Sequence, residues 1–383
     1  MTSRRRETPM IMFDRRLLYS FGWSLFFMTI AFAALALLNL YSASYQTGLV
    51  YFKKQAIWLS IGVVVMVLVS FINNKMIKRY SLHIYGASIF LLIFVLIFGK
   101  EVAGSKSWIM LGPFASIQPS ELAKIPVVLA LARFYDSDYE GFPYGLLDLV
   151  KPALLVALPL VLVMLQPDLG TGLLIILISG SMILFMGVKK VTLAIILAIV
   201  VGFSYPAWHY FMKPYQKSRI MTFLDPARDP LNSGYNAIQS QIAVGSGKFT
   251  GKGFMAGSQS QLRFIPAQQT DFAFSVLAEE WGFVGGFFAL LLYFMIILWI
   301  LDTASRSKDT YSILVCYGIA AMFFWHAVVN VGMVIGLLPI TGVPLLILSY
   351  GGSSTLTAMI GIGIVLGIRM RKFPIPEAAV ELR

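Results

Sequence analysis

Long apolar runs alternate with short polar segments along most of the chain. A helix of about twenty apolar residues crosses the hydrocarbon core of a bilayer, so each run is a candidate span. The pattern predicts ten spans, near residues 18–41, 55–72, 80–99, 119–135, 151–166, 169–187, 190–212, 272–301, 311–337 and 343–368. We therefore expect an all-α, polytopic integral membrane protein with one transmembrane domain over residues 18–370. Short tails would cover residues 1–17 and 371–383.

The composition agrees with this pattern. Hydrophobic residues make up 58% of the chain and charged residues only 13%. The core of a soluble domain could not bury so many apolar side chains. The single cysteine, Cys316, excludes both a disulfide within the chain and a cysteine-based metal site. The histidines, His83, His209 and His326, lie in different segments, so we expect residues at helix interfaces rather than a metal cluster.

Basic residues predict the orientation in the membrane. A net charge of +12 in such a chain indicates topology and anionic headgroups rather than nucleic acid. The N-terminal stretch "MTSRRRETPMIMFDRR" is basic and precedes an apolar run too long for a signal peptide. With this stretch inside, the short outer loops hold few basic residues, namely Lys53, Lys54, Lys100 and Lys106. We expect both termini to be cytosolic.

The segment 213–270, between the seventh and eighth predicted spans, is much longer than the other connections. The predicted orientation makes it a large extracytoplasmic loop. Structureless loops of this length are uncommon and usually functional, so we expect short amphipathic helices on the outer leaflet. No convincing internal repeat is present, which argues against an inverted-repeat transporter.

The stretch "SIQPSELAKIPVV" carries an acid and a base within a predicted span. Glu121 and Lys124 are three residues apart and therefore share one face of a helix. One interpretation is a buried pair that fixes helix packing. The other is a pair that lines a polar cavity, since ionisable groups inside spans usually face one. In that case Lys124 would supply positive charge to a phosphate.

Two aspartates stand where predicted spans begin. Asp168, in "MLQPDLGTGLL", is either a helix N-cap or a residue of a polar cavity. Asp271, in "TDFAFSVLAEEWGFVGG", is either an N-cap or, at the extracytoplasmic mouth, a base for a sugar hydroxyl. Glu279 and Glu280 follow inside the same span. At least one of them must face protein, where a basic group could pair with it.

Glycines and hydroxyls mark two further segments. "VGSGKFTGKGFMAG" resembles a phosphate-binding loop but has Ser246 and Gly253 where that motif needs Gly and Ser or Thr. We expect a glycine-permitted loop that presents Lys248 and Lys252 to lipid headgroups or a diphosphate. The last predicted span starts with hydroxyl side chains, including Ser349. The glycine pairs 282/286, 332/336 and 363/367 predict close helix contacts.

Taken together, the motifs identify a family. "WIMLGPFASIQPSELAKI", "QPDLGTG", "IQSQIAVGSGKFTGKG", "QTDFAFSVLAEEWGFVG" and "NVGMVIGLLPITGVPLLILSYGGSS" occur in this order. Over roughly residues 20–370 the chain resembles the SEDS family (shape, elongation, division and sporulation). "QSQLRFIPAQQTDF" and "LDPARDPLNSGY" favour its elongation branch over its division branch.

The resemblance implies a fold and an activity. It implies ten transmembrane helices and a peptidoglycan glycosyltransferase that polymerises lipid II at the outer face of the bacterial cytoplasmic (inner) membrane. It also implies a class B penicillin-binding protein, a PBP2-like transpeptidase, as partner within the elongation machinery. By the same resemblance Asp271 is the essential, catalytic aspartate, Glu121 and Lys124 line a central cavity, and Trp108 matches the tryptophan of the preceding outer loop.

These assignments predict a mechanism. The C4 hydroxyl of the acceptor GlcNAc attacks the anomeric carbon of MurNAc with inversion, and Asp271 acts as general base. Basic side chains stabilise the departing undecaprenyl diphosphate, with Lys124, Lys248, Lys252 and Arg263 as candidates. A divalent cation, Mg²⁺ or Mn²⁺, could bridge Asp271 and the diphosphate, although no dedicated ligand set is evident. The alternatives are a lipid II flippase or transporter, a scaffold for the penicillin-binding protein, and a division-type paralogue.

Overall fold

The structure, a computed structural model, describes residues 20–102, 105–110, 112, 116–137, 143–226 and 233–371, so both predicted tails lie almost entirely outside it. Within these ranges ten long helices overlap the ten predicted spans one for one. They are α2 (Trp23–Ser44), α3 (Val50–Phe71), α4 (Asn74–Phe98), α5 (Pro119–Ser137), α6 (Val150–Leu165), α7 (Leu169–Met186), α8 (Lys190–Pro206), α12 (Ala273–Ser305), α13 (Thr310–Val334) and α14 (Gly352–Met370). Eight are long and apolar enough to cross a membrane, and α5 and the 16-residue α6 are the others. The all-α membrane fold is confirmed.

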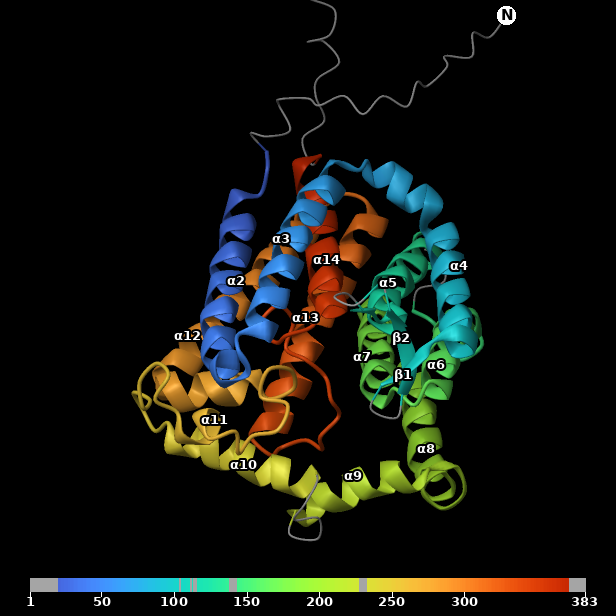
Figure 1. The fold of residues 1–383 in the computed structure, drawn as a ribbon. Coiled ribbons are helices and arrows are strands. Elements are labelled where there is room, and N and C mark those ends of the chain that lie inside the picture. The colour runs from blue at the N-terminus through green and yellow to red at the C-terminus, as the bar shows by residue number, and fades with distance from the viewer. Residues whose placement is uncertain are drawn as a thin grey trace, which may run out of the picture.

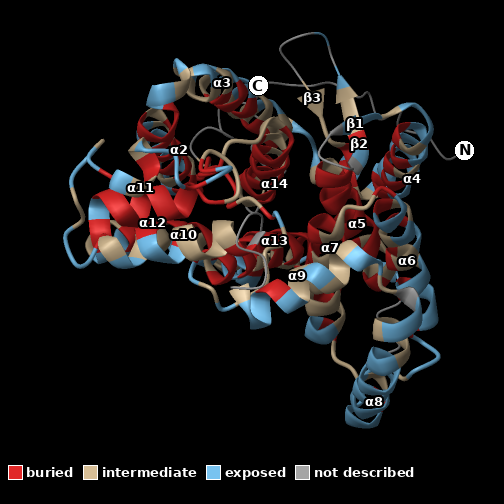
Figure 2. Cartoon of the chain, turned by 60° about the horizontal axis from the view of Figure 1, so that its bottom comes forward, coloured by how far each residue is buried: buried red, intermediate tan, exposed pale blue. Residues whose placement is uncertain are grey.

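The helices form two groups joined at the centre. Helices α2, α3, α12 and α14 pack together on one side, α4 to α7 pack on the other, and α13 contacts both α5 and α7 (Figure 1). Helices α5 and α14 are buried on almost all sides, and in α5 the buried residues include Glu121 and Lys124. Helix α8 projects away from the bundle, and its only buried residue is Thr192 (Figure 2).

The long segment between α8 and α12 folds into short helices. They are the π-helical turn η3 (Ala207–Phe211), α9 (Pro214–Leu224), α10 (Ser233–Ser246) and α11 (Ser258–Gln261). The helices α9 to α11 lie across one end of the bundle, opposite the end where the described chain begins and finishes (Figure 1). The prediction of short helices in residues 213–270 is confirmed. We call this end the loop end and the opposite one the terminal end.

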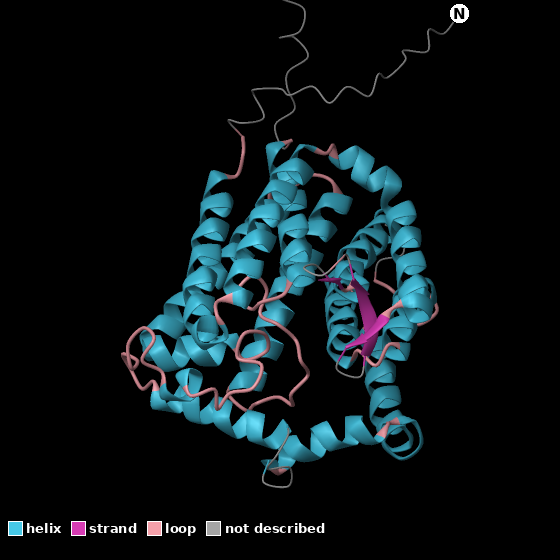
Figure 3. Cartoon of the chain, in the orientation of Figure 1, coloured by secondary structure: helices cyan, strands magenta, loops and turns pink. Residues whose placement is uncertain are grey.

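A small antiparallel sheet connects α4 to α5 (Figure 3). It consists of β1 (Lys100–Val102), β2 (Ser105–Met110) and β3 (Ser116–Ile117), in the order β1-β2-β3. Trp108 lies on β2 opposite Lys100. A single 3₁₀ turn, η1 (Tyr45–Thr47), links α2 to α3. The hydrophobic pattern missed the sheet because its strands are too short to produce a clear alternation.

The final predicted span begins too early. The prediction placed it over 343–368, but α14 starts at Gly352, and residues 335–351 connect α13 to α14 without a helix. This connection is apolar enough to look like part of a span, yet Pro339 and Pro344 remove backbone donors that a helix needs. The prediction for α4 starts too late, because Asn73 caps that helix by accepting a hydrogen bond from the Lys75 amide at 3.0 Å.

The three glycine pairs have different roles. Beta-carbons at positions 363 and 367 would lie 2.6 and 2.9 Å from the carbonyl oxygens of Met66 and Ser70, so this pair does bring α14 close to α3. Gly282 instead has a φ of 64° and interrupts α12. Gly336 has a φ of 78° and follows the end of α13. Both glycines permit a backbone conformation that other residues rarely adopt. A beta-carbon on Gly282 would meet the backbone of residues 249 and 251 rather than a second helix, so the predicted helix contact is wrong there, whereas one on Gly336 would meet the side chain of Gln241 of α10.

Candidate functional site

Asp271 lies immediately before α12, at the loop end. Its backbone carbonyl accepts a hydrogen bond from Asn330 Nδ2 of α13 at 2.9 Å. Its half-buried carboxylate faces the 335–351 connection, where a beta-carbon on Gly342 would lie 3.6 Å from Oδ2. The alternative prediction of an N-cap is wrong, since Phe272 is the N-cap residue of α12 and no side chain caps this helix. The carboxylate is therefore not used to satisfy the helix end.

The surroundings of Asp271 favour its protonated form. Burial raises the pKa of this carboxyl above its ordinary value, and the hydrogen bond with Thr270 and the positive charge of Arg219 offset only part of this effect. Arg219 belongs to α9 and donates to the carbonyl oxygen of Thr341 at 3.2 Å. A carboxylate with a raised pKa is a stronger base than a free aspartate, which suits it to accept a proton.

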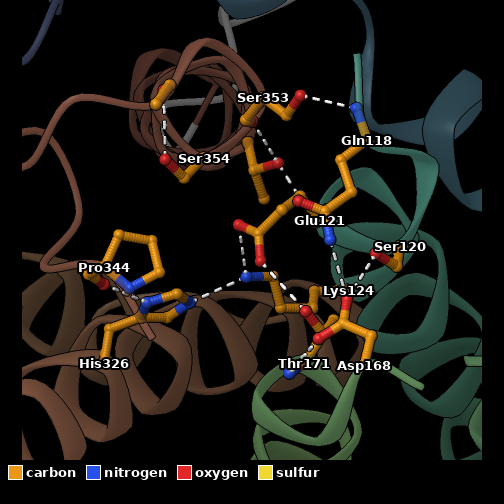
Figure 4. Close-up of polar contacts among 12 residues, drawn as sticks. Gln118, Ser120, Glu121, Lys124, Asp168, Thr171, His326, Pro344, Ser353 and Ser354 are labelled. Atoms are coloured by element: carbon orange, nitrogen blue, oxygen red, sulfur yellow. Dashed lines mark hydrogen bonds and ion pairs between the residues drawn. The ribbon is translucent and has the colours of Figure 1, made fainter. Parts of the chain in front are cut away.

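Glu121 and Lys124 form a buried ion pair in the centre of the bundle. Lys124 Nζ lies 2.9 Å from Glu121 Oε2 and 2.8 Å from His326 Nε2 on α13 (Figure 4). The side chains of Lys124 and Glu121 are 0% and 7% exposed. Thr171 donates to the other oxygen of Glu121 at 3.3 Å. These contacts have the geometry of the packing interpretation, and the cavity role of the pair remains a prediction.

The hydrogen bonds define the tautomer of His326. The Lys124 ammonium has only donors, so His326 Nε2 must accept from it. The proton of the neutral ring is then on Nδ1, which donates to the carbonyl oxygen of Pro344 at 2.8 Å. The sequence correctly indicated a residue at a helix interface here, but it gave no signal that His326 would pair with Lys124.

Asp168 is the N-cap of α7 and accepts from the Thr171 amide at 3.1 Å, which confirms the N-cap prediction. Its second oxygen accepts from Gln118 Nε2 at 2.8 Å and from Ser120 Oγ at 2.9 Å. The carboxylate therefore joins the start of α5 to the start of α7, beside the Glu121 pair (Figure 4).

Glu279 and Glu280 both face protein. Glu279 Oε1 lies 2.7 Å from Lys252 Nζ, and its two oxygens also accept from the amides of Gln259 and Ser260 at 2.8 and 3.0 Å. Glu280 accepts a hydrogen bond from Ser42 of α2. The expectation of a basic partner is confirmed for Glu279. Lys252 was predicted to face headgroups or a diphosphate, but its ammonium is already bound to Glu279.

The glycine-rich segment 247–253 fills the interruption in α12. The amides of Lys252 and Gly253 donate to the carbonyls of Glu279 and Glu280, at 3.1 and 2.9 Å. Beyond Gly282, the amides of residues 283 and 284 donate to the carbonyls of residues 248 and 249, at 2.9 and 3.1 Å. The glycines are needed because a beta-carbon at position 247 or 251 would collide with the backbone of α12. This segment completes a helix rather than cradling a phosphate.

The remaining predicted site residues lie elsewhere. Lys248 is exposed, and so is Arg263, which donates to the carbonyl of Gln46. Trp108 is half-buried in the small sheet. Ser349 is buried and accepts from the Leu345 amide at 3.1 Å. Among the contacts of described residues, none joins these four side chains to Asp271.

The predicted divalent cation has no preformed protein site in the described ranges, where no three His, Cys, Asp or Glu side chains are close enough to hold a metal ion. A cation beside Asp271 would need most of its ligands from a substrate diphosphate or from water. It remains a prediction.

Comparisons with known proteins agree on the family. The model of the FtsW, RodA and SpoVE family, described as "Cell cycle protein", matches residues 21–373. The peptidoglycan glycosyltransferase MrdB of Escherichia coli K12 is 40% identical over 315 residues, covering 82% of this chain and 84% of that relative. The peptidoglycan glycosyltransferase RodA of Treponema pallidum is 34% identical over 427 residues, covering 92% and 98%. The predicted class of enzyme, a glycosyltransferase, agrees with these names.

Solved structures show the same fold. A chain from a structure titled "Structural coordination of polymerization and crosslinking by a peptidoglycan synthase complex" is 32% identical, with a TM-score of 0.80 over 93% of this chain and 99% of that one. The rod shape determining protein RodA of Thermus thermophilus is 28% identical, with a TM-score of 0.69 over 93% and 98%. The chain therefore belongs to the FtsW, RodA and SpoVE family, the SEDS family that its motifs resemble.

Proposed function

We propose that this protein is a peptidoglycan glycosyltransferase that polymerises lipid II during cell elongation. The observation that carries the proposal is the carboxylate of Asp271, half-buried at the loop end and free of any ion pair among the described residues. Burial raises the pKa of this carboxyl, and the side chain does not cap α12. The names of the relatives, MrdB and RodA, support the activity and the elongation role.

In the proposed reaction Asp271 takes the proton from the C4 hydroxyl of the acceptor GlcNAc as its oxygen attacks the MurNAc anomeric carbon. The bond to the undecaprenyl diphosphate breaks, the anomeric centre inverts, and no covalent enzyme intermediate forms. A positioned base of this kind contributes about 10²–10⁴-fold to the rate. The charge that develops on the diphosphate needs cations nearby.

The contacts show which of the candidate cations are already paired with a carboxylate of the protein and which are not. Lys124 and Lys252 already pair with Glu121 and Glu279, so each would have to share its ammonium with the substrate. Lys248 and Arg263 are exposed at the loop end. Arg219 was not among the predicted site residues, yet its charge acts on Asp271. We propose Arg219 as a further candidate, with five donors suited to phosphate.

We propose that the loop end faces outward from the bacterial inner membrane, with both termini in the cytosol. Basic residues at the terminal end support this orientation, because cytosolic ends of spans are enriched in lysine and arginine. Among them are Lys78, which pairs with Asp136 at 2.7 Å, and Arg369, which pairs with Asp302 at 2.7 Å. The proposed partner is a class B penicillin-binding protein. The solved relative in a complex of polymerization and crosslinking supports it.

The test is glycan synthesis from lipid II by the purified protein with its partner in detergent. We expect polymer from the native protein and about 10²–10⁴-fold slower synthesis from Asp271→Asn, although that variant inserts and folds normally. Asp309→Asn is the matched control, because Asp309 caps α13 at the terminal end and asparagine also serves as an N-cap. Polymer at the native level from Asp271→Asn would remove this residue from the mechanism.

The same assay separates the rival functions. A lipid II flippase would give no product in detergent, where no leaflets separate substrate from product. A scaffold for the penicillin-binding protein would tolerate replacement of the carboxylates.

A further inference from the structure

The buried chain Glu121–Lys124–His326 ends on the backbone of a segment that also lies beside Asp271. Lys124 bridges Glu121 and His326, and His326 donates to the carbonyl of Pro344. Resting on the proposed function, we propose that Glu121, Lys124 and His326 are positioning residues. They hold the segment 341–344 against Asp271 and act on the reaction through it, rather than by binding the diphosphate.

Three of the four residues in the segment 341–344 accept a hydrogen bond from another part of the chain. Arg219 donates to Thr341, and Gly342 lies beside the Asp271 carboxylate with a φ of 76°. Asn330 Nδ2 donates to the carbonyl of Val343 at 2.7 Å and to that of Asp271 at 2.9 Å. Pro344 accepts from His326. Gly342 therefore lies beside the Asp271 carboxylate, Val343 shares the Asn330 amide with the Asp271 carbonyl, and Pro344 is fixed by the buried chain.

Lys124 is poorly placed to bind substrate itself. Its side chain is 0% exposed, and two of its three donors are used by Glu121 and His326. Its charge instead dictates that His326 Nε2 accepts and Nδ1 donates. Without the ammonium, the buried Nε2 would have no donor, and a ring that turned to find one would give up the bond to Pro344. This gives the buried cation a defined effect on the backbone beside Asp271.

The test compares Lys124→Met, His326→Leu and the double variant in glycan synthesis from lipid II. Misplacement of a catalytic group by about 1 Å costs about 10²-fold, so we expect each single variant to lower kcat by about that factor with little change in KM. Since the residues act as a unit, the double variant should be about as slow as either single one. A Lys124→Met variant that mainly raises KM, or single effects that multiply in the double variant, would overturn the proposal.

Two conservative variants distinguish positioning from simple loss of packing. His326→Asn places an amide donor near the position of Nδ1, toward Pro344, whereas His326→Gln places an acceptor near Nε2, toward Lys124. We expect Asn to restore more of kcat than Gln. A higher kcat for Gln than for Asn would show that accepting a hydrogen bond from Lys124 is the important role of His326, and would contradict the proposal. These variants keep a polar group in place, so they serve even where His326→Leu does not fold.

Asp271→Asn is assayed in parallel to separate this proposal from the proposed function. If it polymerises lipid II normally, the general base assignment fails. If it is inactive while the Lys124 and His326 effects multiply, only the positioning role fails.

Discussion

Asp271 and Glu279 stand eight residues apart around the start of α12, and their environments are opposite. Glu279 is fully buried, pairs with Lys252 and accepts from two backbone amides. Asp271 is half-buried and has no such ion pair among the described contacts. The oxygens of the Glu279 carboxylate already accept from groups of the protein, so they are not available to accept a proton from a substrate. The difference shows which acid in this stretch of sequence stabilises the fold and which is available for chemistry.

The largest expected effect separates these two acids. Asp271→Asn should lower kcat for glycan synthesis by about 10²–10⁴-fold while the thermal unfolding midpoint stays the same or rises slightly. Glu279→Gln should do the reverse, keeping most of kcat while it lowers the free energy of unfolding by about 1–3 kcal/mol. The measurements are polymer formation and thermal unfolding in detergent. Equal loss of activity in both variants would end the distinction.

The slight rise in stability expected for Asp271→Asn follows from the raised pKa of Asp271. Burial raises the pKa of Asp271 in the folded protein, so the fold binds this proton more tightly than the unfolded chain does. Above that raised pKa the ionised carboxylate therefore costs stability. Asparagine, which cannot ionise, removes that cost.

The second effect concerns the other buried pair. Lys124→Met leaves the Glu121 carboxylate without its cation, which should destabilise the fold by about 3–5 kcal/mol. Adding Glu121→Gln should recover much of that loss, since it removes the stranded charge. Thermal unfolding of the single and double variants measures this. Lys75→Met, on the exposed start of α4, is the control and should change neither stability nor polymer formation appreciably.

The third effect is on the pH dependence of the reaction. A general base works only when it is deprotonated, so the rate should fall as the pH drops through the pKa of Asp271. Because burial raises that pKa, the fall should be centred above about 3.9, the ordinary value for aspartate. Initial rates across a pH series, with folding monitored at each pH, measure it. A rate that stays flat well below the ordinary aspartate range would exclude Asp271 as the base.

The smallest effect lies at the terminal end. Asp309 accepts from the amide and the hydroxyl of Ser312 at 3.1 and 2.9 Å, and it lies 3.2 Å from Lys78. Burial acts to raise the pKa of Asp309, but these partners outweigh it and lower the pKa. Asp309→Ala should cost about 1 kcal/mol of stability. Since a lowered pKa stabilises the fold only above the pKa of the unfolded chain, this difference should disappear as the pH falls toward acid.

Hydrophobic patterning predicted the helices because each span must present about twenty apolar residues to lipid. It could not predict where a helix is interrupted or unfinished. The 335–351 connection is as apolar as a span, and the break at Gly282 lies inside one. Both depend on contacts with distant segments.

The candidate site was predictable to a similar degree. The motifs singled out Asp271, Glu121, Lys124 and Asp168, and spacing alone paired Glu121 with Lys124. His326, Asn330 and Arg219 were missed, because their partners are far away in the sequence. Spacing along one helix is visible in a sequence, but contacts between helices are not.

The interruption in α12 has a consequence for biogenesis. Residues 279–284 rely on 248–253 for four backbone hydrogen bonds that the helix does not make itself. A nascent α12 entering the membrane on its own would carry these amides and carbonyls unsatisfied, which lipid penalises heavily. Its final shape therefore requires the segment 248–253, which is synthesised earlier, to be in place. Maturation of this span thus depends on the loop as well as on the helix.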